Sequence, residues 1–160
     1  MSTSRFRSPI SDAELERRWA AVRVAMAATD VDMLVMQNAS DWVGGYGRWF
    51  TDVAATNGYP RTVLFPAQGL MTSIEMGPFG GLVEVNEAEP SRRGLGRILQ
   101  TPAFVSVGYS NGYDAELLVA ELKRMGARRI GLLAPGALPH AMIAALQEHL
   151  PDAALVDFTD

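Results

Sequence analysis

Side chains capable of acid–base or metal chemistry are few in this 160-residue sequence, and their spacing is poor. The two histidines, His140 and His149, are nine residues apart with no carboxylate at ligand spacing between them, so they do not make a metal site. Glu84, Glu87 and Glu89 suggest paired carboxylates, but nothing implies a buried partner, and a solvated acidic stretch is favoured. Cysteine is absent, which removes thiolate nucleophiles. We therefore predict no catalytic residue and no metal ligands in this chain.

Two patterns suggest anion binding, and both are weak. The glycines between Gly44 and Gly47 lack the Lys-Ser/Thr that follows a phosphate-binding loop, and no strongly periodic helix comes after them. Arg92, Arg93 and Arg97 form the densest basic cluster. This cluster can bind an anion or pair with acidic residues of another domain, but an ordinary solvated helix face is the favoured interpretation.

The composition is that of a soluble globular protein, with 48% apolar and 20% charged residues. The formal net charge of −4 argues against a nucleic-acid partner, which favours a basic face. The apolar runs are far shorter than the roughly 20 residues that a membrane span needs, so no membrane partner is expected. Residues 1–9 contain two arginines without an apolar segment behind them, unlike a secretory signal. These observations favour a cytoplasmic protein.

The elements that would position functional side chains begin with a helix. Ser11 and Glu14 have the spacing of a capping box, in which each side chain binds the backbone N–H of the other residue. An apolar face then recurs at helical spacing through Leu15, Trp19, Val22 and Met26. Residues 31–36 are typical of a buried strand.

A turn-rich stretch from Asn38 to Gly58 contains Trp42 and Trp49 and has no consistent period, which indicates an ordered loop or a short helical turn. The two tryptophans can form a lid or an interface patch, since aromatic anchors are enriched at interfaces. The alternative is that they seal the edge of a small core. Residues 62–65 and 71–75 then predict a hairpin, because the connection Pro66-Ala67-Gln68-Gly69 is rich in turn formers.

The middle of the chain is ambiguous. Residues 82–85 are compatible with a strand, and residues 103–107 predict another. Between them, Leu95, Ile98 and Leu99 have helical spacing, which Gly94 and Gly96 weaken.

The last third reads as alternating strands and helices. A helix opens at Ser110 or Asp114 and closes at Gly126, which is well placed as a C-terminal cap. Residues 129–134 predict a strand, Pro139 suits the first turn of a further helix, and residues 154–158 predict a final strand. Short connections between such elements are typical of βαβ units. The fold class is therefore α/β, a mixed β-sheet flanked by helices, in one domain over residues 1–160.

The order of these landmarks resembles the amino-terminal domain of the creatinase/prolidase/aminopeptidase P family, which has a ribonuclease H-like motif. The resemblance covers nearly the whole chain and rests on order and spacing in five segments: residues 31–36, 38–47, 62–75, 122–132 and 138–157.

The resemblance implies a protein with a second, larger domain of the pita-bread type, which binds two divalent metal ions and is missing from this chain. It also implies that the parent enzyme hydrolyses Xaa-Pro peptides or creatine-like molecules. The present domain would hold a homodimer together and close over an active site, and would itself contain no cofactor. Since the sequence stops where a strand ends, we expect a domain boundary near Asp160.

One local match suggests a substrate contact. In creatinase-like members an aromatic-x-Arg sequence reaches a neighbour's substrate, and Tyr59-Pro60-Arg61 occupies that place. Arg61 would bind a substrate carboxylate through two charge-assisted hydrogen bonds, and Tyr59 would offer a ring face. The alternative is that Arg61 pairs with a surface carboxylate and Tyr59 packs at a strand entrance. Pro60 replaces the glycine of creatinase-like members, which leaves the substrate class open.

A second class of function also fits the same fold. The chain can be a free-standing module that acts through protein–protein contacts, in which case a partner protein rather than a substrate is expected. The two classes differ in whether the native polypeptide continues into a His/Asp/Glu-bearing domain.

Overall fold

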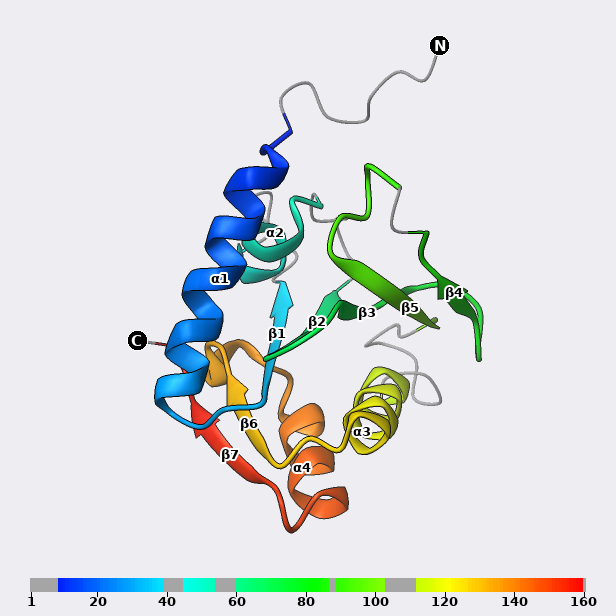
Figure 1. Ribbon diagram of the computed structural model, residues 1–160. Coiled ribbons are helices and arrows are strands. Elements are labelled where there is room, and N and C mark those ends of the chain that lie inside the picture. Colours follow the sequence, from blue (N-terminus) through cyan, green and yellow to red (C-terminus); the bar gives the residue numbers. More distant parts are fainter. Residues whose placement is uncertain (1–8, 39–44, 54–59, 87–88, 103–111, 160) are drawn as a thin grey trace.

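The structure is a computed structural model that describes residues 9–38, 45–53, 60–86, 89–102 and 112–159. In this part of the chain seven strands form one mixed sheet, in the order β4-β5-β3-β2-β1-β6-β7 (Figure 1). The strands are β1 (Met33–Asn38), β2 (Arg61–Pro66), β3 (Met71–Met76), β4 (Leu82–Glu84), β5 (Leu95–Thr101), β6 (Arg129–Leu132) and β7 (Ala154–Asp157). The helices are α1 (Asp12–Ala28), α2 (Gly45–Thr51), α3 (Tyr113–Met125) and α4 (His140–His149), with a short 3-10 turn η1 (Pro135–Ala137) before α4. The mixed α/β sheet expected from the sequence is confirmed.

Helix α1 begins where the sequence predicts. The Ser11 side chain accepts the backbone N–H of Glu14 at 3.2 Å, which satisfies one free donor of the first turn. The carboxylate of Glu14 does not complete the reciprocal capping box, because it pairs instead with Arg17 at 2.7 Å and Arg18 at 2.8 Å. The hydrogen bonds from these two arginines lower the pKa of Glu14 to about 2.

The predicted hairpin is present as β2 and β3, which pair antiparallel. Gly69, in the connection, has a φ of +90°, a conformation that glycine adopts without steric cost. β1 begins two residues later than predicted and lies inside the sheet, antiparallel to β2 and parallel to β6. α2 confirms a short helical turn in the tryptophan-bearing stretch.

The helical interpretation of residues 95–99 is wrong, because these residues form strand β5. β5 pairs parallel with β3 and antiparallel with β4. The pairing with β3 shifts register and leaves Gly96 as an extra residue, so Leu95 and Ile98 lie on the same face of the sheet. The three-residue spacing of Leu95 and Ile98 on one face therefore results from a β-bulge and not from a helix.

Helices cover both faces of the sheet (Figure 1). α1 and α2 pack on one face, where Met26, Phe50 and Phe65 belong to one buried cluster. α3 and α4 pack on the other, where Leu118 and Leu146 belong to a second cluster. α3 ends at Gly126, whose φ of 69° confirms the predicted glycine cap. The strand predicted at 103–107 lies outside the described residues. None of the described helices is long and apolar enough to cross a bilayer.

Candidate functional site

Arg61, the predicted substrate contact, starts strand β2 and is 6% exposed. Its Nε lies 3.0 Å from Oε1 of Glu75 on the neighbouring strand β3. The same oxygen accepts hydrogen bonds from Arg92 at 2.6 Å and from the Ser73 hydroxyl at 2.7 Å. The backbone N–H of Arg61 donates to the side chain of Asn38, at the end of β1. We call Arg61, Ser73, Glu75 and Arg92 the Glu75 network.

This network holds a carboxylate in its charged form under the α1/α2 face of the sheet. Burial raises the pKa of Glu75, but the hydrogen bond from Arg92, the charge of Arg61 and the hydrogen bond from Ser73 outweigh it, so the pKa lies below 4.5. Two guanidinium groups against one carboxylate leave one net positive charge. Arg61 thus pairs with a carboxylate, as the alternative interpretation has it, but this carboxylate is half-buried rather than at the open surface.

The partners of Arg61 were not foreseen from the sequence. Ser73 and Glu75 are two residues apart on a predicted strand, so their side chains point to one face. Two polar residues at that spacing, on the same strand face as the buried Met71, are the signal that indicates a buried charged partner. Tyr59, the other half of the predicted contact, lies outside the described residues, and the contact itself stays a prediction.

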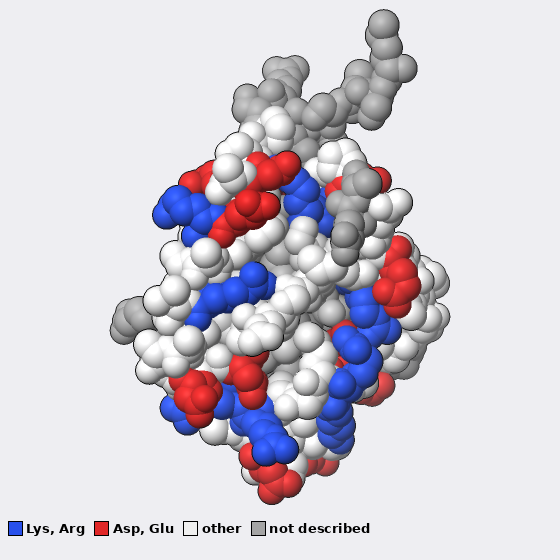
Figure 2. Space-filling view, viewed as in Figure 1, with Lys and Arg blue, Asp and Glu red and all other residues white. Residues whose placement is uncertain are grey.

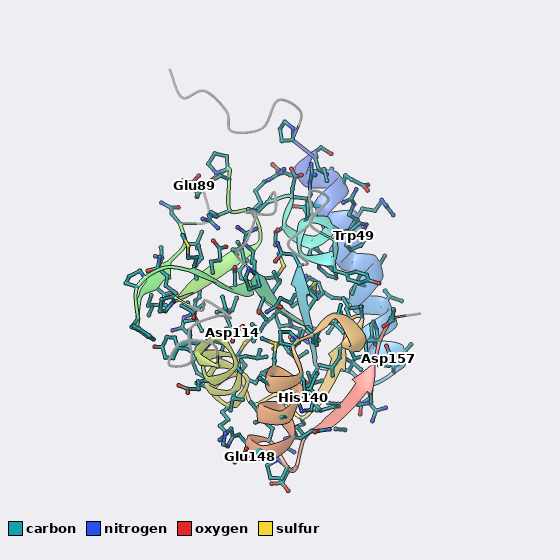
Figure 3. All side chains as sticks on the ribbon, turned by 180° about the vertical axis from the view of Figure 1, so that it is seen from behind. Trp49, Glu89, Asp114, His140, Glu148 and Asp157 are labelled. Atoms are coloured by element: carbon teal, nitrogen blue, oxygen red, sulfur yellow. The ribbon has the colours of Figure 1, made fainter. Side chains whose placement is uncertain are left out.

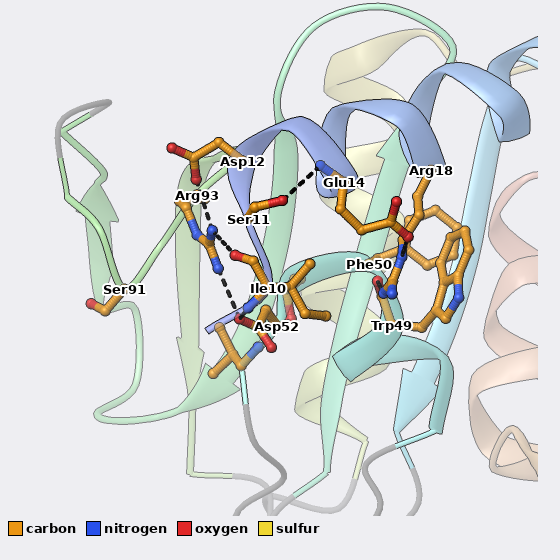
Figure 4. Close-up of polar contacts among 12 residues, drawn as sticks. Ile10, Ser11, Asp12, Glu14, Arg18, Trp49, Phe50, Asp52, Ser91 and Arg93 are labelled. Carbon is orange, nitrogen blue, oxygen red and sulfur yellow. Dashed lines mark hydrogen bonds and ion pairs between the residues drawn. The ribbon is translucent and has the colours of Figure 1, made fainter. Parts of the chain in front are cut away.

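Of the two tryptophans predicted at an interface, the structure describes Trp49, whereas Trp42 lies outside the described residues. Trp49 is 40% exposed on α2 and meets the ring of Phe50 edge to face, with centroids 4.9 Å apart (Figures 3 and 4). The Arg18 guanidinium lies 5.1 Å from its ring centroid. α2 is attached to α1 through the Trp19 indole N–H, which donates to the Phe50 carbonyl at 2.8 Å. An exposed indole on an anchored helix is compatible with either role predicted for it.

The basic cluster at 92–97 is not a solvated helix face. Arg93 donates to Asp12 at 2.7 Å and to Asp52 at 2.8 Å, and also to the Ile10 carbonyl (Figure 4). Asp52 in turn accepts the Ile10 N–H at 2.9 Å. Arg93 therefore fastens the start of α1 and the end of α2 to the turn before β5.

A second paired carboxylate, this one buried, lies on the opposite face of the sheet. Glu121 of α3 is 3% exposed and accepts hydrogen bonds from Thr72, Arg97 and Arg124 at 2.8 to 3.1 Å. Burial raises the pKa of Glu121, but these three partners together lower it below 4.5. We call this group the Glu121 network. On the face drawn in Figure 2, basic and acidic side chains lie interspersed, in keeping with such pairing.

Asp114 is a buried acid at the start of α3 (Figure 3). Its Oδ1 accepts the N–H of Ala115 at 2.8 Å, and its Oδ2 lies 3.4 Å from the side-chain nitrogen of Gln37. Burial raises the pKa of Asp114, and these hydrogen bonds offset only part of that effect. The arrangement shows no nucleophile or histidine beside this carboxyl among the contacts of the described residues.

The remaining sequence candidates lie apart. His140 and His149 stand at opposite ends of α4. Glu84 pairs with Arg97 at 3.2 Å, Glu89 binds Ser91, and Glu87 lies outside the described residues. Among the residues described, no group of three His, Cys, Asp or Glu side chains could hold a metal ion. The described residues therefore offer no ligand set for a two-metal centre.

Comparison with solved structures identifies the fold. A structure of Xaa-Pro aminopeptidase from Streptococcus pyogenes matches at a TM-score of 0.61 and 15% identity, over 93% of this chain and 95% of that one. The N-terminal domain of the cytoplasmic peptidase PepQ from Mycobacterium tuberculosis matches at 0.57 and 14% identity, over 89% and 93%. No family model and no curated protein sequence matches this chain.

A third match concerns a longer polypeptide. Xaa-Pro dipeptidase from Bacillus anthracis matches at a TM-score of 0.59 and 16% identity, over 91% of this chain but 34% of that protein. The present chain thus spans about a third of that enzyme's length. The fold is that of the amino-terminal domain of Xaa-Pro peptidases and prolidases, and the resemblance read from the sequence is confirmed at the level of fold.

Proposed function

We propose that this chain is the amino-terminal, non-catalytic domain of a metal-dependent hydrolase that cleaves Xaa-Pro peptides or creatine-like molecules. The observation that carries the proposal is the fold match over 91% of this chain to one third of an Xaa-Pro dipeptidase. At 16% identity that match supports the domain type and leaves the substrate to experiment. We further propose that the protein acts in the cytoplasm, because PepQ, which has the same fold, is described as a cytoplasmic peptidase.

The metal chemistry would belong to the catalytic domain. Two divalent ions held there would supply the Lewis acidity for hydrolysis of the scissile C–N bond. The described residues of this chain offer no ligand set for them. The tasks left to this domain are to join two subunits, with Trp42 and Trp49 at the contact, and to close over the active site.

Arg61 is the residue through which the domain would contact substrate. Its guanidinium lies in the Glu75 network, where Glu75 restrains the side chain and limits the entropy lost on binding. A substrate carboxylate would be bound by charge-assisted hydrogen bonds, with Tyr59 beside it. This assignment rests on the resemblance at residues 59–61.

The length of the native polypeptide tests the domain assignment first. We expect the endogenous protein, measured by mass spectrometry, to continue well beyond Asp160 and to hydrolyse Ala-Pro in the presence of Mn²⁺. The isolated 160-residue chain should show no turnover under the same conditions. A native polypeptide that ends at Asp160 would instead support the free-standing interaction module.

The role of Arg61 is tested separately in the full-length enzyme. Arg61→Ala should raise KM by about tenfold or more with little change in kcat, because uniform binding energy is lost. Arg97→Ala is the matched control, since it breaks an arginine–glutamate pair on the other face of the sheet. It should lower stability and leave KM unchanged. If both variants leave KM unchanged, the substrate contact is wrong while the domain assignment stands.

A further inference from the structure

An apolar hollow of about 480 Å³ opens between α1, α2 and the ends of β6 and β7. Val22 of α1 forms one wall, and Tyr46 and Trp49 of α2 form another. Leu133, directly after β6, and Phe158, directly after β7, form the rest of the lining that faces these helices. Its volume falls in the range of small-molecule sites, about 300 to 1,000 Å³.

The backbone around the hollow explains why it exists. At Gly131, an added Cβ would lie 2.6 Å from Cδ2 of Leu34 and 3.0 Å from Cβ of Phe158. Because Gly131 has no side chain, Leu34 and Phe158 can pack closely against its backbone, which deepens the hollow that they line. Ala134 then has a φ of 49°, in the left-handed region that residues with a side chain rarely adopt. This conformation turns the chain away from the sheet at the rim, and its N–H donates to the Thr159 hydroxyl at 3.0 Å.

The topology supplies an independent reason to assign a ligand here. β1, β6 and β7 are parallel, so their carboxyl ends lie at one edge of the sheet. The next described element after β1 is α2, on the α1 face, whereas β6 leads through η1 into α4 on the opposite face. Open α/β sheets bind ligands outside the carboxyl ends of strands where connections diverge in this way. The hollow lies beside the carboxyl ends of β6 and β7, next to this divergence.

The lining restricts the chemistry of the ligand. It contains no charged side chain among the described residues that form it. The guanidinium of Arg18, which lies against the Trp49 wall, is already paired with Glu14. An ionised group entering the hollow would lose water without gaining a partner. Aromatic walls on α2 favour a flat ring, which gains edge-to-face or offset contacts with Tyr46 and Trp49.

We propose that the hollow binds an uncharged small molecule with a fused aromatic ring system. This site is separate from the Glu75 network and does not depend on the proposed hydrolase function, although it shares Trp49 with the proposed subunit contact. Strain at Ala134 is consistent with it, because residues held in sparsely populated backbone conformations cluster at ligand sites.

The test uses the 160-residue chain and two probes that differ in charge. N-phenyl-1-naphthylamine is uncharged, and 8-anilinonaphthalene-1-sulfonate has a similar ring system with an added sulfonate. Fluorescence titration should show saturable binding of the uncharged probe and roughly tenfold weaker binding of the sulfonate. NMR shifts of the Gly45 and Gly131 amides should move with the same saturation curve.

A matched pair of variants on α1 locates the site. Val22→Trp fills the hollow and should weaken binding about tenfold or more, whereas Val24→Trp makes the same change at a position that is 71% exposed and should have no effect. Because an enlarged Val22 can disturb folding, Trp49→Ala provides a second measure. It removes a partly exposed wall and should also weaken binding, with the thermal unfolding midpoint as the check on folding.

Several results would overturn the proposal. Equal affinity for the two probes would mean that the lining does not select against charge. Probe binding that survives both Val22→Trp and Trp49→Ala in folded variants would place the probe elsewhere. Self-association in sedimentation equilibrium that Val22→Trp abolishes, without saturable probe binding, would make the hollow a contact between two copies. Amide shifts that appear only in a full-length polypeptide would make it a docking surface for a catalytic domain.

Discussion

Thr72 and Ser73 are neighbours on β3, and their side chains point to opposite faces of the sheet. Each hydroxyl donates to a glutamate, Thr72 to Glu121 at 2.9 Å and Ser73 to Glu75 at 2.7 Å. Each glutamate also binds two arginines, which are Arg97 and Arg124 for Glu121, and Arg61 and Arg92 for Glu75. The same chemistry thus occurs twice, back to back.

The two networks differ in what they connect. Glu121 belongs to a helix and uses both carboxylate oxygens, so it ties α3 to β3 and β5. Around Glu75 the ion pair with Arg61 and the hydrogen bonds from Arg92 and Ser73 converge on Oε1, and Arg61 and Ser73 come from strands that the sheet already pairs. A long-range tie adds to tertiary stability more than a contact between neighbours does. The comparison indicates that the Glu121 network contributes more to stability than the Glu75 network, which contains the Arg61 of the proposed substrate contact.

Removing Glu121 should have the largest effect. Glu121→Ala leaves Arg97 and the Thr72 hydroxyl without their buried partner, so we expect the free energy of unfolding to fall by about 3 to 5 kcal/mol. Urea unfolding followed by circular dichroism measures the change. A loss below about 1 kcal/mol would contradict a structural role for this network.

Glu75→Ala should cost less, about 2 to 3 kcal/mol, because the Glu75 side chain is 12% exposed and its hydrogen bonds converge on one oxygen. The measurement is the same urea titration on the same chain. Should Glu75→Ala prove more destabilising than Glu121→Ala, the assignment of roles would be reversed.

The dependence of stability on pH should follow both carboxyls. Their pKa values are lowered below 4.5 in the folded state, so the folded state binds fewer protons than the unfolded state does. The contribution of these two carboxyls to the free energy of unfolding is therefore fully present above pH 4.5 and is lost as pH drops through their folded pKa values. The loss is at most about 1.4 kcal/mol per pH unit for each proton. Thermal unfolding between neutral and acidic pH checks this slope, which should be shallower in Glu121→Ala.

Asp114 should act in the opposite direction. Its pKa is raised above 3.8, so the folded state binds more protons, and this group favours folding increasingly as pH falls through its folded pKa. The Asp114→Asn variant should accordingly lose stability more steeply with acid than the unmodified chain, and a parallel curve would refute the raised pKa.

The outer arginines should give the smallest effects. Arg124 is 52% exposed in its side chain and Arg92 is 24% exposed. Arg124→Gln should cost less than about 1 kcal/mol, as exposed ion pairs do, and Arg92→Gln should cost more than Arg124→Gln. A double-mutant cycle with the respective glutamate isolates each pair, and equal coupling energies would remove the difference between the two networks.

Local features of the fold were readable from the sequence. Ser11 caps α1 and Gly126 ends α3 as expected, since capping depends on residues within one turn of the helix. The hairpin around Gly69 was also predictable, because turn formers between two apolar runs act locally. The order of such elements sufficed to indicate the α/β fold and its likeness to the Xaa-Pro peptidase domain.

Strand register and the pairing of charges were decided only by the tertiary structure. The bulge at Gly96 gave β5 the spacing of a helix, and only its pairing with β3 shows which face each side chain occupies. Likewise, Thr72 and Glu121 are 49 residues apart and Arg93 reaches Asp12 across 81, so neither contact leaves a trace in a local pattern. Periodicity and capping are properties of a few consecutive residues, whereas a buried ion pair depends on where the folded chain brings distant residues together.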